Sequence, residues 1–113
     1  MQNENKRSQP RAKCKWQARV INSEKQIQKA TCVNISEEGC CVAVPTKYSN
    51  GEKVMIEVAA SFYTERVKFK MLGQVAYSTF HASSGMHHCG IDFITEFDDN
   101  REFIMRYVAS QLR

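Results

Sequence analysis

Short runs in which every second residue is apolar recur along this chain, and they constrain its fold more than any other feature. Between Cys14 and Val20 the apolar residues alternate with Lys, Gln and Arg. A period of two is typical of a strand with one buried face. Similar runs predict further strands at about 27–35, 40–44, 54–58, 66–77 and 89–94. Turn-forming residues lie between them, with Asn50-Gly51 as the strongest signal.

The alternation also predicts which side chains share a face. Thr31, Val33 and Ile35 are expected on one face of the second strand. In the fifth strand the residues expected on one face are Val67, Phe69, Met71, Val75 and Tyr77. Gly73 in the middle of that strand predicts a bulge or a bend. The small polar residues 78–87 are expected to form a loop.

The end of the chain changes to a helical period. Asp98-Asp99-Asn100 offers an N-cap and an acidic first turn. The apolar residues that follow at helical spacing are Phe103, Ile104, Tyr107, Val108 and Leu112. A helix is therefore expected over about residues 97–112. Six short strands and one helix predict a mainly β fold, a six-stranded antiparallel β-barrel with a C-terminal α-helix, and 113 residues fit one domain.

Positive charge is concentrated at the N-terminal end. Residues 1–29 carry a formal charge of +6, whereas the remaining 84 residues carry −2. Residues 1–13 are polar and show no hydrophobic period, so we expect a flexible basic arm over 1–13 and a folded domain over 14–113. This asymmetry favours an anionic partner that binds near the N-terminus.

Apolar run length and cysteine content predict a cytoplasmic protein. The longest uninterrupted apolar run, Cys40 to Val44, is far shorter than the roughly 20 residues that span a bilayer. The N-terminal residues lack the apolar stretch of a secretory signal. The five cysteines include no CxxC pair, and we expect them to be reduced thiols.

Two arginines in the basic arm carry chemistry suited to a phosphorylated ligand. Arg7 and Arg11, preceded by Lys6, form an RxxxR motif. Each guanidinium is a planar fork that can bind a phosphate or the O6/N7 edge of guanine through two hydrogen bonds. Such a pair also arises by chance in a basic segment, so it is weak evidence by itself.

A second polar motif, Asn34-Ile35-Ser36-Glu37-Glu38-Gly39, follows the second strand. Asn34 and Ser36 can hydrogen-bond the backbone of their own turn, closed by Gly39 at a positive φ. Alternatively, the two side chains point outward and bind the base edge and phosphates of a nucleotide. The sequence leaves both interpretations open.

Together these motifs resemble the PilZ domain family, whose signature is RxxxR in an N-terminal arm followed by [D/N]xSxxG. Gly73-Gln74-Val75-Ala76-Tyr77 looks like the family's GxVxW-type strand, and Cys89-Gly90-Ile91-Asp92-Phe93 is similar to its GIxF strand. The resemblance covers nearly the whole chain. It implies a six-stranded PilZ-type barrel with a C-terminal helix.

The resemblance also implies a ligand, the bacterial second messenger cyclic di-GMP. By position, Arg7 and Arg11 would hold phosphates and guanine edges. Asn34 and Ser36 would complete these contacts. Gly39 would let the backbone approach the ligand closely.

Three further positions follow from the resemblance. Tyr77 stands where many members have a tryptophan near the base, and Ser78 stands where some have an arginine. Lys6 favours binding of an intercalated pair of ligands. Closure of the arm over the ligand would then signal to an effector protein that controls motility, adhesion or a related surface behaviour.

Two alternative functions come from other classes. One is a PilZ-like adaptor that binds a protein partner and no nucleotide, which the intact motifs argue against. The other is a small barrel that binds single-stranded nucleic acid, which needs a basic groove along the strands. Positive charge confined to the arm disfavours it.

The sequence predicts neither an enzyme nor a bound cofactor. It has no P-loop, no Rossmann glycine pattern and no G-x-S-x-G nucleophile elbow. His87 and His88 are neighbours on a strand and would point to opposite sides, which disfavours a shared metal ion. The carboxylates Glu37-Glu38, Asp92 and Glu96 lack a paired nucleophile and are interpreted as solvated surface.

Overall fold

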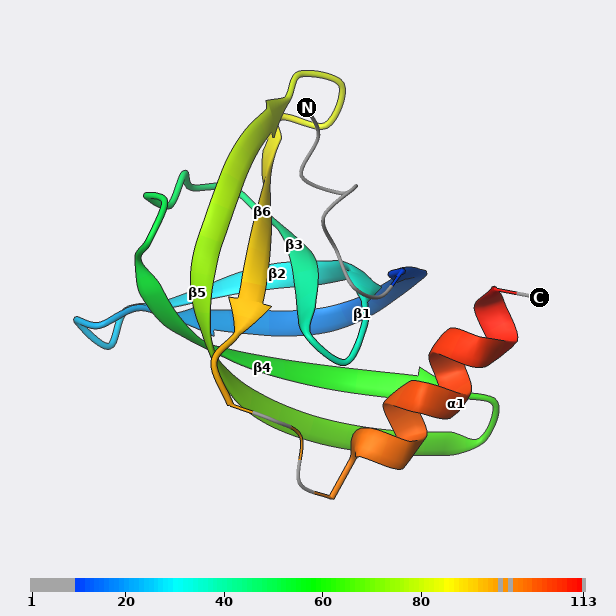
Figure 1. The fold of residues 1–113 in the computed structure, drawn as a ribbon. Helices are drawn as coiled ribbons and strands as arrows, with labels where there is room; N and C mark the ends of the chain where they lie inside the picture. The colour runs from blue at the N-terminus through cyan, green and yellow to red at the C-terminus, as the bar shows by residue number, and fades with distance from the viewer. Residues whose placement is uncertain (1–9, 96, 98, 113) are drawn as a thin grey trace.

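The structure is a computed structural model that describes residues 10–95, 97 and 99–112. Six strands are followed by one helix (Figure 1). These elements are β1 (Ala12–Ile21), β2 (Ile27–Ile35), β3 (Gly39–Val44), β4 (Lys53–Phe62), β5 (Glu65–His81), β6 (Met86–Phe93) and α1 (Arg101–Gln111). The predicted mainly β architecture, with six strands and a C-terminal helix, is therefore confirmed.

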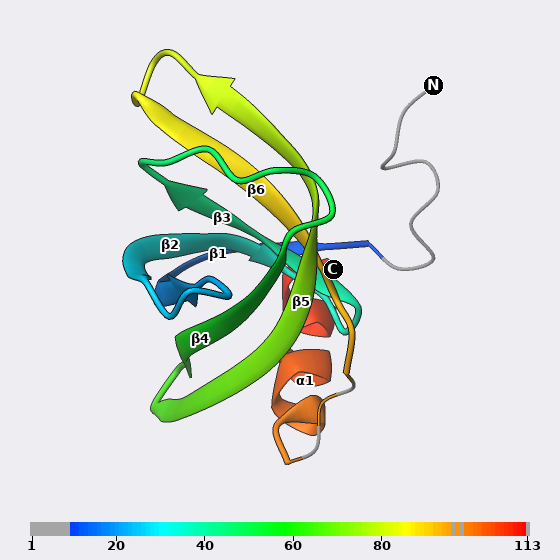
Figure 2. The same cartoon turned by 90° about the vertical axis from the view of Figure 1, so that its left-hand side faces the viewer.

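All neighbouring strands pair antiparallel, in the order β1-β2-β3-β6-β5-β4. The sheet closes on itself because β4 also pairs with β1. The long strand β5 pairs with β4 along its first part and with β6 along its second, so it curves from one side of the sheet to the other (Figures 1 and 2).

Alternate residues of the strands fill the interior, and α1 covers one end of it. Phe103, Ile104 and Tyr107 are the buried side chains of α1. The ring of Tyr107 lies 4.7 Å from that of Trp16, and its hydroxyl donates to the carbonyl of Lys13 at 2.6 Å. Figure 1 places this helix at the opposite end of the molecule from the β5–β6 turn. Within the described ranges, no helix has the length and apolar content needed to cross a membrane.

Several element boundaries differ from the sequence prediction. The predicted loop 78–87 is wrong, because β5 continues to His81 and β6 begins at Met86. In these segments the backbone N–H and C=O groups pair with those of the neighbouring strand, although the side chains are small and polar. The strand β1 begins at Ala12 instead of Cys14. The helix begins only at Arg101. The side chain of the N-cap residue Asn100 does not cap the helix; its side-chain amide instead donates to the carbonyl of Lys68.

Two irregularities change which side chains face outward. Val33 is an extra residue in the β2–β3 pairing. The prediction that Thr31, Val33 and Ile35 share one face is therefore wrong. The buried side chains of this part of β2 are Cys32 and Ile35. Ala76 is an extra residue in the β5–β6 pairing, which separates Tyr77 from the inward-facing Val75. A bulge inserts one residue and so reverses the alternation beyond it.

Gly73 is not the site of the predicted bulge, because it stays in register with both of its neighbouring strands. A Cβ at Gly73 would collide with the side chain of Ile91. This glycine therefore permits close packing across the interior.

Candidate functional site

A row of directly opposed residues crosses five strands of the sheet. Its members, in order across β1, β2, β3, β6 and β5, are Lys13, Asn34, Cys41, Gly90 and Tyr77. Opposed residues in a ladder point to the same face. The residues next to this row along their strands, Cys40 and Ile91, are completely buried in the interior. The row therefore lies on the outer face of the sheet.

Tyr77 reaches this outer face because of the bulge at Ala76. Its ring lies over Gly90, where a Cβ would overlap the ring carbons. The predicted common face of Tyr77 with the inward-facing Val75 is therefore wrong. An aromatic ring lying on an outer strand face is a suitable platform for a purine base.

Arg11 lies beside this row, at the start of β1. Its side chain is only 6% exposed. A Cβ at Gly39 would lie 2.6 Å from Arg11 Nη2 and 2.5 Å from the carbonyl oxygen of Ile91. Gly39 thus leaves room for the guanidinium. The predicted positive φ at Gly39 is wrong, since among the described glycines Gly51 and Gly85 have that conformation.

The guanidinium of Arg11 is poorly satisfied for a buried charge. Its Nη2 lies 3.7 Å from Asp92 Oδ1, longer than the usual charge-assisted hydrogen bond of about 2.7–2.9 Å. Its Nε and Nη1 are buried and have no hydrogen-bond partner. Buried polar groups are normally paired, so these donors mark a position at which a ligand can supply acceptors.

Two other buried side-chain oxygens share this property, one on each face of the sheet. Asn34 Oδ1 and Ser78 Oγ are buried and make no hydrogen bond with the described residues. Asn34 lies in the outer-face row, between Lys13 and Cys41, whereas Ser78 directly opposes the buried Cys89 and points inward. Asn34 therefore presents an unused acceptor on the same row as the ring of Tyr77.

Ser36 is used inside its own turn. It is 1% exposed, its hydroxyl accepts from the amide of Glu38 at 3.2 Å and its amide donates to the carbonyl of Gly39 at 2.9 Å. The sequence left open whether Ser36 stabilises its own turn or binds a ligand. These hydrogen bonds show that Ser36 stabilises its own turn. They position Gly39 beneath Arg11.

The structure thus brings together four of the predicted site residues: Arg11, Asn34, Gly39 and Tyr77. Lys6 and Arg7 lie outside the described residues. Asp92 was interpreted from the sequence as solvated surface, and its contact with Arg11 was missed. A charged residue inside the apolar run Cys89-Gly90-Ile91-Asp92-Phe93 was the signal that could have drawn attention to it.

The histidines near the β5–β6 turn pack in two separate aromatic pairs. His87 packs against Phe80 and His88 stacks on His81, with ring centres 3.6 Å apart, so the two neighbours point to opposite sides as predicted. No group of three or more metal-ligating side chains occurs in the described part of the chain. Partial burial, followed by the nearby His81, lowers the pKa of His88.

The cysteines have little exposure to solvent, and no disulfide joins them in the described structure. Cys32, Cys40 and Cys89 belong to the hydrophobic core, whereas Cys41 is buried on the outer face and Cys14 is partly exposed. Burial, with smaller contributions from Cys41 and Cys40, raises the pKa of Cys89 to about 12. A thiol with so high a pKa is almost entirely protonated at neutral pH and is a poor nucleophile.

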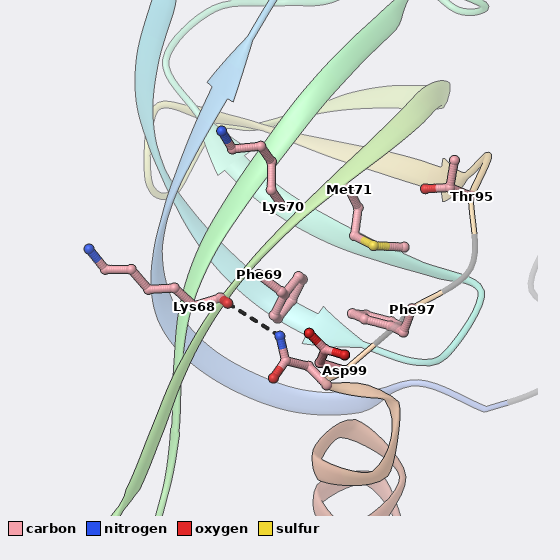
Figure 3. A pocket seen from close by; sticks show the side chains of 8 residues that line it. Lys68, Phe69, Lys70, Met71, Thr95, Phe97 and Asp99 are labelled. Atoms are coloured by element: carbon pink, nitrogen blue, oxygen red, sulfur yellow. Dashed lines mark hydrogen bonds between the residues drawn. The ribbon is translucent and has the colours of Figure 1, made fainter.

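A separate cavity of about 690 Å³ lies between β5 and the segment that leads to α1. Phe69, Met71 and Phe97 form its apolar wall, while the side chains of Lys68 and Lys70 point away from them (Figure 3). It contains none of the unpaired polar atoms described above. The outer face around Arg11 is therefore the stronger candidate.

The chain matches a known domain family over most of its length. Residues 5–110 match the PilZ domain. No curated protein sequence matches the chain. Among solved structures, the chain is similar to MotI/DgrA, the inhibitor of motility from Bacillus subtilis, with a TM-score of 0.81 and 12% identity. That match covers 99% of this chain and 52% of MotI.

Two further structures have the same fold. The PilZ domain of YcgR from Escherichia coli, solved with cyclic di-GMP, matches with a TM-score of 0.68 and 12% identity, covering 95% of this chain and 92% of that domain. MrkH from K. pneumonia in its apo state matches with a TM-score of 0.71 and 13% identity, covering 94% and 52%. The chain thus spans about half the length of MotI and MrkH. Because the match to the family extends over residues 5–110, the chain belongs to the PilZ domain family.

Proposed function

We propose that this chain is a cyclic di-GMP receptor that binds the nucleotide on the outer face around Arg11, Asn34 and Tyr77. The observation that carries the proposal is Arg11, a buried guanidinium with two nitrogens that lack hydrogen-bond partners. Leaving buried donors unpaired costs free energy in the empty protein. An anionic ligand would supply the missing acceptors and relieve that cost.

The chemistry of cyclic di-GMP suits these residues. The ligand carries two negative phosphates and two flat guanines. It therefore offers both an anion for a guanidinium and a base for an aromatic ring. Arg11 would donate to a phosphate or to the O6/N7 edge of a guanine. Asn34 Oδ1 would accept from a guanine N–H, and the ring of Tyr77 would stack on a base.

The basic arm would complete the site. Arg7 would add a second guanidinium, and Lys6 favours an intercalated pair of ligands over a single one. We propose that the arm closes over the bound ligand and creates a surface for an effector protein. The cost of ordering the arm would be offset by the ionic contacts that it makes.

Known PilZ proteins support this assignment. The family comprises cyclic di-GMP receptors and adaptors, and the similar YcgR domain was solved with that ligand. MotI is an inhibitor of motility. Control of motility, adhesion or a related surface behaviour is therefore the output that we propose for this chain.

Isothermal titration with cyclic di-GMP, with GTP as the control ligand, tests the proposal. We expect saturable binding of cyclic di-GMP and no binding of GTP. Arg11→Ala should weaken the binding of cyclic di-GMP by about 10- to 100-fold. A hydrogen bond to a charged group contributes about 1.5–3 kcal/mol, which corresponds to a change in Kd of that size. Arg19→Ala is the matched control, because it removes the same charge from the other end of β1.

The stoichiometry would separate one ligand per chain from an intercalated pair. Absence of both heat and a thermal shift at high ligand concentration would contradict the receptor proposal. In that event the adaptor without nucleotide binding becomes the function to pursue by partner capture.

A further inference from the structure

Asp92 is the acidic group that the structure pairs with Arg11 of the proposed ligand site. It lies in β6, directly opposite Gly39 in β3 and Gln74 in β5. Because Arg11 lies over Gly39, the carboxylate of Asp92 is beside the guanidinium, with 3.7 Å between Oδ1 and Nη2. Asp92 is the one carboxylate paired with Arg11 among the described residues.

We propose that Asp92 is an internal competitor of the ligand: it holds Arg11 in the empty site and lowers the affinity for the anionic nucleotide. This inference rests on the proposed binding of cyclic di-GMP. The carboxylate and a ligand phosphate are both acceptors for the same guanidinium. Occupation of the site therefore requires Arg11 to exchange one anion for another.

The geometry of the pair suits such an exchange. The side chain of Arg11 is 6% exposed and is held in place by Gly39, whereas that of Asp92 is 68% exposed. The carboxylate is therefore hydrated and can rotate away, while the arginine stays. The separation of 3.7 Å is also too long for a strong charge-assisted hydrogen bond, so a phosphate that approaches more closely can replace it.

Repulsion acts in the same direction. A phosphate bound to Arg11 would lie within a few ångströms of the Asp92 carboxylate, and two negative charges at that separation repel each other. Two lysines on more distant strands do not remove this effect, since Lys53 in β4 and Lys13 in β1 are exposed and form no ion pair with Asp92 in the described structure. Asp92 thus limits how tightly the site holds an anion.

The opposite role for Asp92 is also chemically reasonable and predicts the opposite result. A carboxylate can accept hydrogen bonds from the N1 and N2 groups of guanine and so strengthen binding. Asp92→Asn would then weaken the complex. The carboxylate of Asp92 lies beside the Arg11 guanidinium and is largely exposed. Both observations favour competition between Asp92 and the ligand for Arg11.

Titration of Asp92→Asn with cyclic di-GMP decides between the two roles. The control is Glu24→Gln, which makes the same change in net charge in the β1–β2 turn, at the far end of β1 from Arg11. Asp92→Asn should tighten binding by about threefold to fivefold, the effect of an exposed ion pair. Glu24→Gln should change the Kd by less than about twofold, since solvent and salt screen a distant surface charge.

A double-mutant cycle shows whether the effect passes through Arg11. In the Arg11→Lys background, the gain from Asp92→Asn should change, because the two side chains interact. An equal gain in both backgrounds would mean general electrostatics and would overturn the inference. Unchanged or weaker binding by Asp92→Asn would also overturn it.

These failures differ from failure of the proposed function. If the wild-type chain binds no cyclic di-GMP, both the receptor proposal and the role of Asp92 fall. If the wild type binds and Asp92→Asn does not bind more tightly, the receptor proposal stands and the competition does not. Thermal melts of each variant would confirm that the exposed substitutions leave the fold intact.

Discussion

Two arginines at opposite ends of β1 differ in a way that stability alone does not explain. Arg19 is 54% exposed, yet its Nε donates to Glu57 at 3.0 Å, and Lys70 lies 3.3 Å from the same carboxylate. Arg11 is 6% exposed, yet among the described residues its one carboxylate partner is 3.7 Å away and two of its nitrogens have no hydrogen-bond partner.

A buried charge normally needs the better partners, because it has lost its hydration. Here the exposed arginine has them. This inversion supports the proposed ligand site at the Arg11 end of the sheet, because the described residues do not supply the acceptors that its guanidinium lacks. The Arg19 end is an ordinary ion-paired surface.

The most severe test of this difference is Gly39→Ala. The added Cβ would meet the Ile91 carbonyl and Arg11 Nη2, and the backbone oxygen has little freedom to move. We expect the free energy of unfolding to fall by about 1–3 kcal/mol, as in other overpacked sites, and ligand binding to be lost. Urea denaturation and titration measure the two effects.

Ala59→Val is the control for that substitution. Ala59 is exposed on β4 and pairs with Gln17, toward the Arg19 end of β1. It should leave both stability and binding nearly unchanged. If Gly39→Ala bound ligand normally, the close approach of Arg11 to Gly39 would be unimportant for the site.

Arg11→Ala separates binding from stability. Since the guanidinium is buried and poorly paired, its removal should not destabilise the empty protein. We expect an unchanged or higher Tm together with the loss of binding described above. A Tm lower by more than about 5 °C, or about 1 kcal/mol for a small domain, would show that Arg11 is mainly structural.

The pH dependence of stability tests a third part of the outer face, the stacked pair His81 and His88. The pKa of His88 is lowered in the folded state by its partial burial and by His81. As the pH falls below about 6.5, the unfolded chain therefore binds this proton before the folded protein does, and stability decreases. Thermal melts between pH 7.5 and 5 should show a smaller decrease for His88→Gln than for the wild type; equal decreases would exclude His88 as the source.

Arg19→Ala should have the smallest effect. Its partner Glu57 keeps Lys70, and exposed ion pairs contribute little to stability. Thermal melts at low and high salt should show nearly the same Tm as the wild type. A marked loss of stability would mean that the two arginines differ less than their surroundings indicate.

Much of this architecture was predictable from the sequence because period-two patterns report burial directly. Residues 27–35 coincide with β2, and the alternation from Trp16 to Val20 is the inward face of β1. The β5–β6 hairpin was not predictable in the same way. Residues such as Ser78 and His87 have no strong strand preference, and pairing with the neighbouring strand determines their conformation.

The composition of the site was also predictable, in part. The motifs that include Arg11, Asn34 and Gly39 predicted a nucleotide ligand through their resemblance to the PilZ family, and this ligand stays a prediction. The role of Gly39 was not predictable, because a glycine that closes a turn and a glycine that admits a neighbour's guanidinium look the same in a sequence. Tyr77 was assigned to the wrong face, because an extra residue at Ala76 leaves no local mark in the alternation.

The sequence by itself determined the strand-rich architecture, the closing helix and the basic character of the N-terminal end. These properties depend on local periodicity and on residue type, which are both readable along one chain. Only the tertiary structure decided that Arg11 is buried over Gly39, that Asp92 is its neighbour and that Tyr77 shares their face. Those relationships join residues from three different strands and the start of another, and they depend on register and bulges that only strand pairing sets.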